Sequence, residues 1–173
     1  EIPEIRRRAI QSIEVSLRHG ADDQLTELIA ALTPLANDPD LVVRLQLMLS
    51  LGEAKGDSGA TLLGRMLIEN FDDHFLRSAG LTSLTPDNIG GVLQETLNAS
   101  ADDLNEELLG MLLAQAAAMG KGDQLADPLK QLVATIHADS PATRLEIAGN
   151  TLNRMINDAG DVLKKDAAFI AVL

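Results

Sequence analysis

Residues 38–52 read DPDLVVRLQLMLSLG, and this stretch decides the fold of the chain. Asp38 can accept hydrogen bonds from free N–H groups at a helix start, and Pro39 suits the first helical position because its missing N–H is not needed there. Leu47 and Leu51 lie four residues apart, on one face of such a helix. The stretch therefore predicts a helix over residues 39–51 that ends before Gly52.

Apolar residues recur at three- and four-residue spacing along the whole chain, and no stretch alternates strictly between apolar and polar residues. We therefore predict an all-α fold of about nine to ten helices in antiparallel pairs. The predicted spans are 4–18, 22–36, 39–51, 57–70, 72–84, 86–98, 103–119, 123–137, 140–157 and 160–172. Pro128 is expected to start, kink or split its helix.

The predicted core leucines are Leu47, Leu51, Leu63, Leu67, Leu93, Leu112, Leu129, Leu132 and Leu152.

Aspartates mark the helix starts in two interleaved sets. The first set is Asp22, Asp57, Asp87 and Asp123, and the second is Asp38, Asp72, Asp102 and Asp139. Both sets repeat every 30 to 37 residues. Two sets with the same period indicate a two-helix unit repeated about four times, which is typical of an α-solenoid. We expect residues 1–173 to form one right-handed α-α superhelix.

The stretch from Asp38 to Gly52 resembles the second helix of a HEAT repeat, with Pro39, Val43-Arg44 and the Ser50-Leu51-Gly52 ending in the family's places. The resemblance implies a ladder in which each aspartate caps its helix and each arginine reaches an aspartate of the neighbouring repeat. Its members would be Asp38, Arg44, Asp72, Arg77, Asp139 and Arg144. The third unit departs from the pattern, because Glu107 and Leu108 lie near the expected arginine.

A narrower resemblance covers residues 38–67 and 72–84. They look like the HEAT segment of large exported planctomycete-type proteins that join a dehydrogenase-like β-propeller, a HEAT array and a haem-binding cytochrome c module. This resemblance implies a middle domain excised from a longer protein, in a periplasmic or otherwise exported location. Any redox chemistry would then lie outside these residues.

Composition excludes several classes of function. The chain has no Cys, so disulfides, Cys-ligated zinc, Cys nucleophiles and covalent c-type haem are excluded. Its net charge of −12 disfavours nucleic-acid binding, because only the run Arg6–Arg8 is basic, and that run is expected to face water. The longest apolar stretch, residues 108–120, is shorter than the roughly 20 residues that cross a bilayer, so no membrane insertion is expected.

No motif for catalysis is present. His19, His74 and His137 lie near predicted helix ends without a partner at metal-binding spacing. Asp72-Asp73-His74 could hold a divalent cation, although a capping turn is the favoured interpretation. No phosphate loop and no G-x-S-x-G occurs. We assign no catalytic, cofactor-binding or metal residues and expect no cofactor.

Two hypotheses remain. The favoured one is a non-catalytic scaffold whose helices 39–51, 72–84, 103–119 and 140–157 line a concave face. Its partner would be a protein or neighbouring domains of the same chain, with a basic or neutral surface and salt-sensitive binding. The candidate binding residues are polar residues of this face that are expected neither to cap a helix nor to join the ladder. They are Gln46, Asn105, Gln115, Asn150 and Asn153.

The alternative hypothesis is a HEAT-like enzyme of the DNA glycosylase, iron-dependent hydroxylase or bilin lyase type. A glycosylase needs a basic groove and aromatic residues, whereas this chain is acidic and lacks Trp and Tyr. A hydroxylase of this type needs His-Glu pairs, and the chain has no His-Glu dipeptide. Stoichiometric iron or zinc in the purified protein would favour the enzyme.

Overall fold

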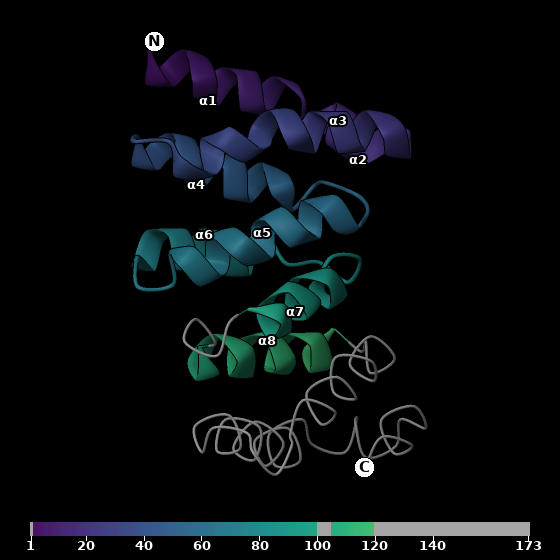
Figure 1. The fold of residues 1–173 in the computed structure, drawn as a ribbon, viewed down its shortest axis with the longest axis vertical. Helices are drawn as coiled ribbons and strands as arrows, with labels where there is room; N and C mark the ends of the chain where they lie inside the picture. The colour runs from purple at the N-terminus through teal and green to yellow at the C-terminus, as the bar shows by residue number, and fades with distance from the viewer. Residues whose placement is uncertain (1, 100–104, 120–173) are drawn as a thin grey trace. The chain divides into compact units, whose positions relative to one another are not determined.

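The computed structural model describes residues 2–99 and 105–119 (Figure 1). Within these ranges every regular element is a helix and no strand forms, which confirms the all-α prediction. The chain divides into two compact units, Glu1–Val92 and Leu93–Leu173. The helices predicted over 123–137, 140–157 and 160–172, with Pro128 and the leucines at 129, 132 and 152, lie outside the described residues.

The described helices follow the predicted order with two breaks. They are α1 (Pro3–Ser12), α2 (Glu14–His19), α3 (Asp22–Leu32), the 3₁₀ helix η1 (Thr33–Asn37), α4 (Leu41–Leu51), α5 (Asp57–Glu69), α6 (His74–Thr82), α7 (Ile89–Asn98) and α8 (Glu106–Ala118). The single helix predicted over 4–18 is wrong, because the backbone turns at Ile13 with φ −99° and ψ 0°. The helix predicted over 22–36 ends as η1, since Pro34 has no N–H to continue an α-helical ladder.

In unit Glu1–Val92 the helices pack in two layers. Helices α1, α4 and α6 lie side by side in one layer, and α3 and α5 lie beside each other in a second layer that packs against it. Arg6 of α1 binds Asp38 in the turn before α4, and Arg44 of α4 binds Asn70, the C-cap of α5 in the turn that leads to α6. Because each helix start meets the next, α1, α4 and α6 run parallel, and we call them the α1–α4–α6 layer.

The core of this unit lies between the two layers. Leu47 and Leu51 of α4 and Leu63 and Leu67 of α5 are fully buried, as predicted. Gly80 of α6 lies against the side chains of Leu67 and Met48, where there is no room for a Cβ. A Cβ there would collide with the Leu67 side chain and lie 2.9 Å from the Met48 methyl group.

The loop between α4 and α5 ties α2 to the rest of the unit. The Lys55 N–H donates to the Leu17 carbonyl at 3.2 Å. This hydrogen bond joins backbone groups that are 38 residues apart in the sequence. The loop then reverses at Gly56, where φ is +79°, a conformation that suits glycine because it lacks a Cβ. The ion pair between Arg18 of α2 and Glu53 also joins this loop to α2.

The turn between α6 and α7 is held by Asn88. Its buried side chain accepts a hydrogen bond from Thr85 N–H at 2.8 Å and donates to the Ser83 carbonyl at 3.0 Å. We predicted that Asp87 would open this helix, and that is wrong, because Asp87 lies exposed in the turn and α7 begins at Ile89.

In the second unit, the predicted core residues Leu93 and Leu112 are buried. Leu112 belongs to an apolar face of α8 that also includes Leu108, Leu109, Leu113 and Ala116. Counted from Leu108, the other four residues follow after one, four, five and eight residues, which is the pattern of a helix with one buried side.

Candidate interaction surface

Three arginines occupy the same place in three parallel helices. Arg6, Arg44 and Arg77 are each the fourth residue of their helix, in α1, α4 and α6. The equivalent position of α8 is Leu109, which is buried. Arg6 therefore belongs with Arg44 and Arg77 by its place in its helix. From the sequence it was interpreted only as part of a run of arginines that faces water.

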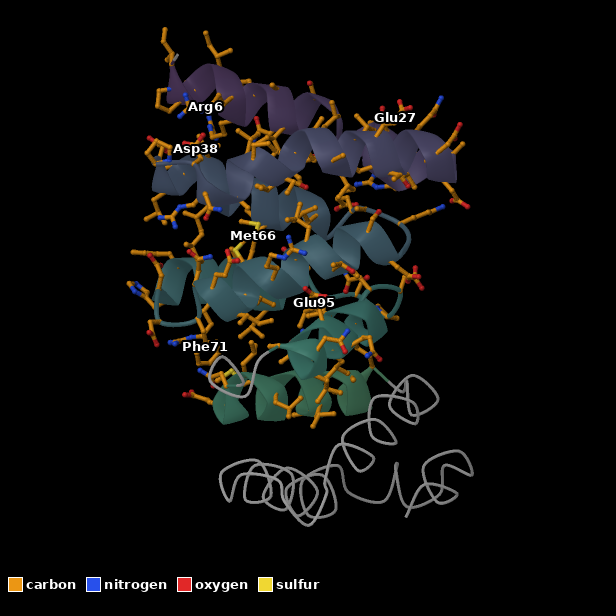
Figure 2. All side chains as sticks on the ribbon, in the orientation of Figure 1. Arg6, Glu27, Asp38, Met66, Phe71 and Glu95 are labelled. Carbon is orange, nitrogen blue, oxygen red and sulfur yellow. The ribbon has the colours of Figure 1, made fainter. Side chains whose placement is uncertain are left out.

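Arg6 makes the best-formed ion pair of the described residues (Figure 2). Its Nε and Nη2 donate to the two carboxylate oxygens of Asp38 at 2.6 and 2.8 Å. The Asp38 side chain is only 4% exposed, so this pair is shielded from water. The hydrogen bond from Arg6 lowers the pKa of Asp38, and the backbone N–H of Asp40 and the charge of Arg44 lower it further.

The other two arginines do not reach aspartates. Arg44 Nη1 donates to Asn70 Oδ1 at 2.9 Å, and its buried Nε has no hydrogen-bond partner. Arg77 Nη1 donates to the Phe71 carbonyl at 2.9 Å, and its guanidinium lies 5.0 Å from the Phe71 ring centroid. The expected Arg-to-Asp contacts therefore do not form for Arg44 and Arg77, because an amide and a carbonyl occupy the acceptor positions. Asp139 and Arg144 lie outside the described residues.

The helix caps also differ from the predicted ones. Asp40 Oδ1 accepts from the N–H groups of Val42 and Val43 at 2.9 and 3.2 Å. Asp73 Oδ1 accepts from Phe75 and Leu76 at the same two distances. Asp38 and Asp72 were predicted as these caps, but each lies one or two residues too early to reach the N–H groups of the first turn.

The aspartates of the first set also do not cap their helices. Asp22 and Asp57 are the first helical residues of α3 and α5, and neither helix start has a side-chain cap. At that position a carboxylate still interacts favourably with the positive end of the helix dipole.

Gln46 belongs to a polar network that joins α4 to α1 and α2. It accepts from Gln11 Nε2 at 2.7 Å and donates to Glu14 and Ser50 at 3.2 and 3.1 Å. Ser50 is fully buried and donates to Glu14 at 2.7 Å. Gln46 was predicted as a partner-binding residue, but its amide is already used to join α4 to α1 and α2.

The remaining predicted binding residues divide into three cases. Asn105 caps α8, because its Oδ1 accepts from the Leu108 N–H at 3.0 Å. Gln115 is half-buried on α8. Asn150 and Asn153 lie outside the described residues. Asn105 was selected as a polar residue that does not cap a helix, and the structure corrects that premise.

The outward side of α4 and α6 carries apolar side chains that the sequence analysis did not select. Val42 and Phe75 are each the second residue of their helix and are 52% and 55% exposed, and Leu49 is 47% exposed. Thr82 of α6 is equivalent to Leu49, and its hydroxyl donates to Ser78 and Ala79 carbonyls, so its methyl group is left for contact. We call Val42, Leu45, Leu49, Phe75 and Thr82 the α4–α6 stripe.

Charges are distributed unevenly between the two layers. The spans of α4 and α6 contain no Asp or Glu, although the chain has 26. The α3–α5 layer instead carries exposed carboxylates at Asp22, Asp23, Glu27, Asp57 and Glu69, of which Glu27 is marked in Figure 2. The two helices of the stripe therefore carry no carboxylate on an acidic protein, and their charged side chains include Arg44 and Arg77.

The basic run at residues 6–8 is neutralised within the chain. Arg7 donates to both oxygens of Glu4, and Arg8 Nε donates to Glu4 Oε1 at 2.9 Å. The hydrogen bond from Arg7, with those of Arg8, lowers the pKa of Glu4 to about 2. Because Arg6 binds Asp38, each arginine of the run already has a carboxylate partner.

The described residues offer no metal centre and no membrane-crossing helix. Nowhere among them do three or more His, Asp or Glu side chains gather as metal ligands. At Asp72-Asp73-His74, Asp73 caps α6 and the His74 ring lies 3.8 Å from the Phe75 ring. Over the same residues, no helix combines the length and apolarity that a bilayer span requires.

Comparison with family models, with curated proteins and with solved structures found no match to this chain.

Proposed function

We propose that this chain is a non-catalytic, HEAT-like α-solenoid scaffold that binds a partner protein, or neighbouring domains of a longer chain, through the α4–α6 stripe. The parallel layer of α1, α4 and α6 against α3 and α5 is the arrangement that stacked helix pairs produce, and we propose that the pairs form a right-handed superhelix. An exported redox protein, as the narrower resemblance implies, is the proposed context.

The observation that carries the proposal is the group of exposed apolar side chains on α4 and α6, two helices that contain no Asp or Glu. Val42, Leu49 and Phe75 are each about half exposed, on two neighbouring parallel helices. Exposed apolar side chains that gather on one face mark interaction sites more often than single scattered ones. The proposal thus moves the binding residues from the polar Gln46 and Asn105 to this stripe.

Site-specific photocrosslinking tests the proposal. A photoreactive phenylalanine would replace Leu49 or Phe75 in the full chain, and Val15 or Glu27 in matched controls outside the stripe. In cells of the source organism, positions 49 and 75 should give the same crosslinked partner, and Phe75→Asp should abolish the adduct formed from position 49. Equal adducts from positions 15 and 27 would contradict the proposal.

A further inference from the structure

We infer that the occupant of the α4–α6 stripe is an amphipathic helix of the partner, which lays an apolar face along α4 and α6 and carries a Lys or Arg over their starts. This inference rests on the proposed function and adds the chemistry of the partner. It is drawn from the spacing of the apolar side chains, the backbone they stand on and the charges around them.

The spacing of the stripe matches a helix. Val42 and Leu49 are seven residues apart, so they are separated by about 10 Å along α4. Phe75 lies on the neighbouring helix, and packed helices are about 8–10 Å apart. Apolar residues at positions i, i+3, i+4 and i+7 of a partner helix also extend over about 10 Å. Such a helix can contact Val42, Leu49 and Phe75 together.

The stripe does not offer the groups that other common modes of peptide binding require. A partner strand needs a row of free backbone N–H and C=O groups, whereas the interior backbone groups of α4 and α6 bond within their own helices. A proline-rich segment needs a groove of several aromatic rings, and Phe75 is the one ring of the stripe. A phosphopeptide needs available arginines, but Arg44 and Arg77 already donate to Asn70 and Phe71.

The charges around the stripe indicate where a basic residue of the partner helix would lie. The stripe has no carboxylate of its own, so a charged residue of the partner would lose water there without gaining a counterion. At the helix starts, four aspartates (Asp38, Asp40, Asp72 and Asp73) stand against Arg6, Arg44 and Arg77, and Arg6 is paired with Asp38. Asp72 is exposed, and Asp40 and Asp73 each use only Oδ1 to cap their helices. A Lys or Arg at one end of the partner helix therefore finds carboxylates at this edge.

Three displayed peptide libraries of equal size test the inference against the full chain. One has the apolar pattern of an amphipathic helix, one alternates like a strand, and one is proline-rich. Binders should come from the helical library, and their affinity is measured by fluorescence anisotropy. Phe75→Ser and Leu49→Ser should each raise the Kd about tenfold or more. Asp72→Asn should raise it about twofold to fivefold and reduce its salt dependence.

Val15→Ser is the matched control, because Val15 is 68% exposed on α2, outside the stripe. It should change the Kd by less than about twofold, as surface substitutions outside an interface do. Thr82→Arg is a second stripe variant in case Phe75→Ser lowers the thermal midpoint. Strand or proline-rich binders that are lost with Phe75→Ser would overturn the helix but not the proposed function. No binder from any library, or equal loss with Val15→Ser, would overturn both.

Discussion

At the residue scale, the buried side chain of Asp38 joins the start of α1 to the turn before α4. It is buried, and Arg6, from 32 residues earlier in the chain, neutralises it. Asp38→Asn should lower the free energy of unfolding at pH 7 by about 1–3 kcal/mol, because a shielded, charge-assisted pair is lost while the acceptor for Asp40 N–H remains. Urea denaturation measures the change.

The pH dependence of that loss has a definite sign. The pKa of Asp38 is lowered in the folded protein. Its stabilising contribution is therefore complete above the unfolded pKa of about 3.9 and disappears as the pH falls through the lower folded value. The difference between wild type and Asp38→Asn should shrink below about pH 4. Glu4→Gln is the control, because Glu4 pairs with Arg7 at an exposed site, and it should leave the urea midpoint nearly unchanged at pH 7.

Gly80 tests the contact between the layers. Its position has no space for a Cβ beside Leu67 and Met48. Gly80→Ala should therefore destabilise the protein by about 1–3 kcal/mol, although alanine is the better helix former. Gly90→Ala, at a half-buried position of α7, is the comparison, and it should cost less or stabilise. Equal midpoints for the two variants in thermal unfolding would contradict the packing described here.

At the scale of the element, the caps of α4 and α6 give a sharp test. Asp73→Ala removes the side-chain oxygen that accepts from the N–H groups of Phe75 and Leu76 at the start of α6. It should lower the free energy of unfolding by about 1 kcal/mol, within the range of about 0.5–2 kcal/mol for N-caps. Asp72→Ala, one residue earlier at an exposed position, should change stability by less than about 0.5 kcal/mol. The reverse order in urea denaturation would restore Asp72 as the cap.

These caps also separate the features of the fold that the sequence predicted from those that it did not. Apolar spacing predicted every described helix from α3 to α8 to within a few residues, because burial of one face decides where a helix forms. It could not choose between Asp38 and Asp40, or between Asp72 and Asp73, since both residues of each pair suit a helix start. The choice depends on where the backbone leaves the extended conformation, and both Asp40 and Asp73 are extended.

The candidate site was harder to predict than the helices. Polar residues were the predicted binding residues, yet Gln46 and Asn105 form hydrogen bonds inside the protein. The signal that could have found the stripe was the absence of Asp and Glu from residues 41–51 and 74–82. Arg6 was missed because its partner Asp38 is brought near only by the packing of α1 beside α4.

At the scale of the whole molecule, the net charge of −12 opposes folding through self-repulsion. Raising NaCl from 0.05 to 0.5 M should therefore raise the thermal midpoint by about 2–5 °C, because added salt screens charges beyond a few ångströms. Screening of the exposed Arg18–Glu53 pair costs little. Glu27→Gln with Glu69→Gln removes two exposed charges and should reduce the salt effect. A midpoint that falls with NaCl would contradict this account.

The backbone bond from Lys55 to Leu17 has a consequence for local opening. Amides in short loops usually exchange with deuterium quickly, because nothing holds them away from solvent. The Lys55 amide is different, since its acceptor belongs to a fully buried residue of α2. It should exchange only when α2 detaches from the loop after α4, and therefore at the same rate as the interior amides of α2. An amide in a connecting loop would then report the opening of a helix 38 residues earlier in the chain.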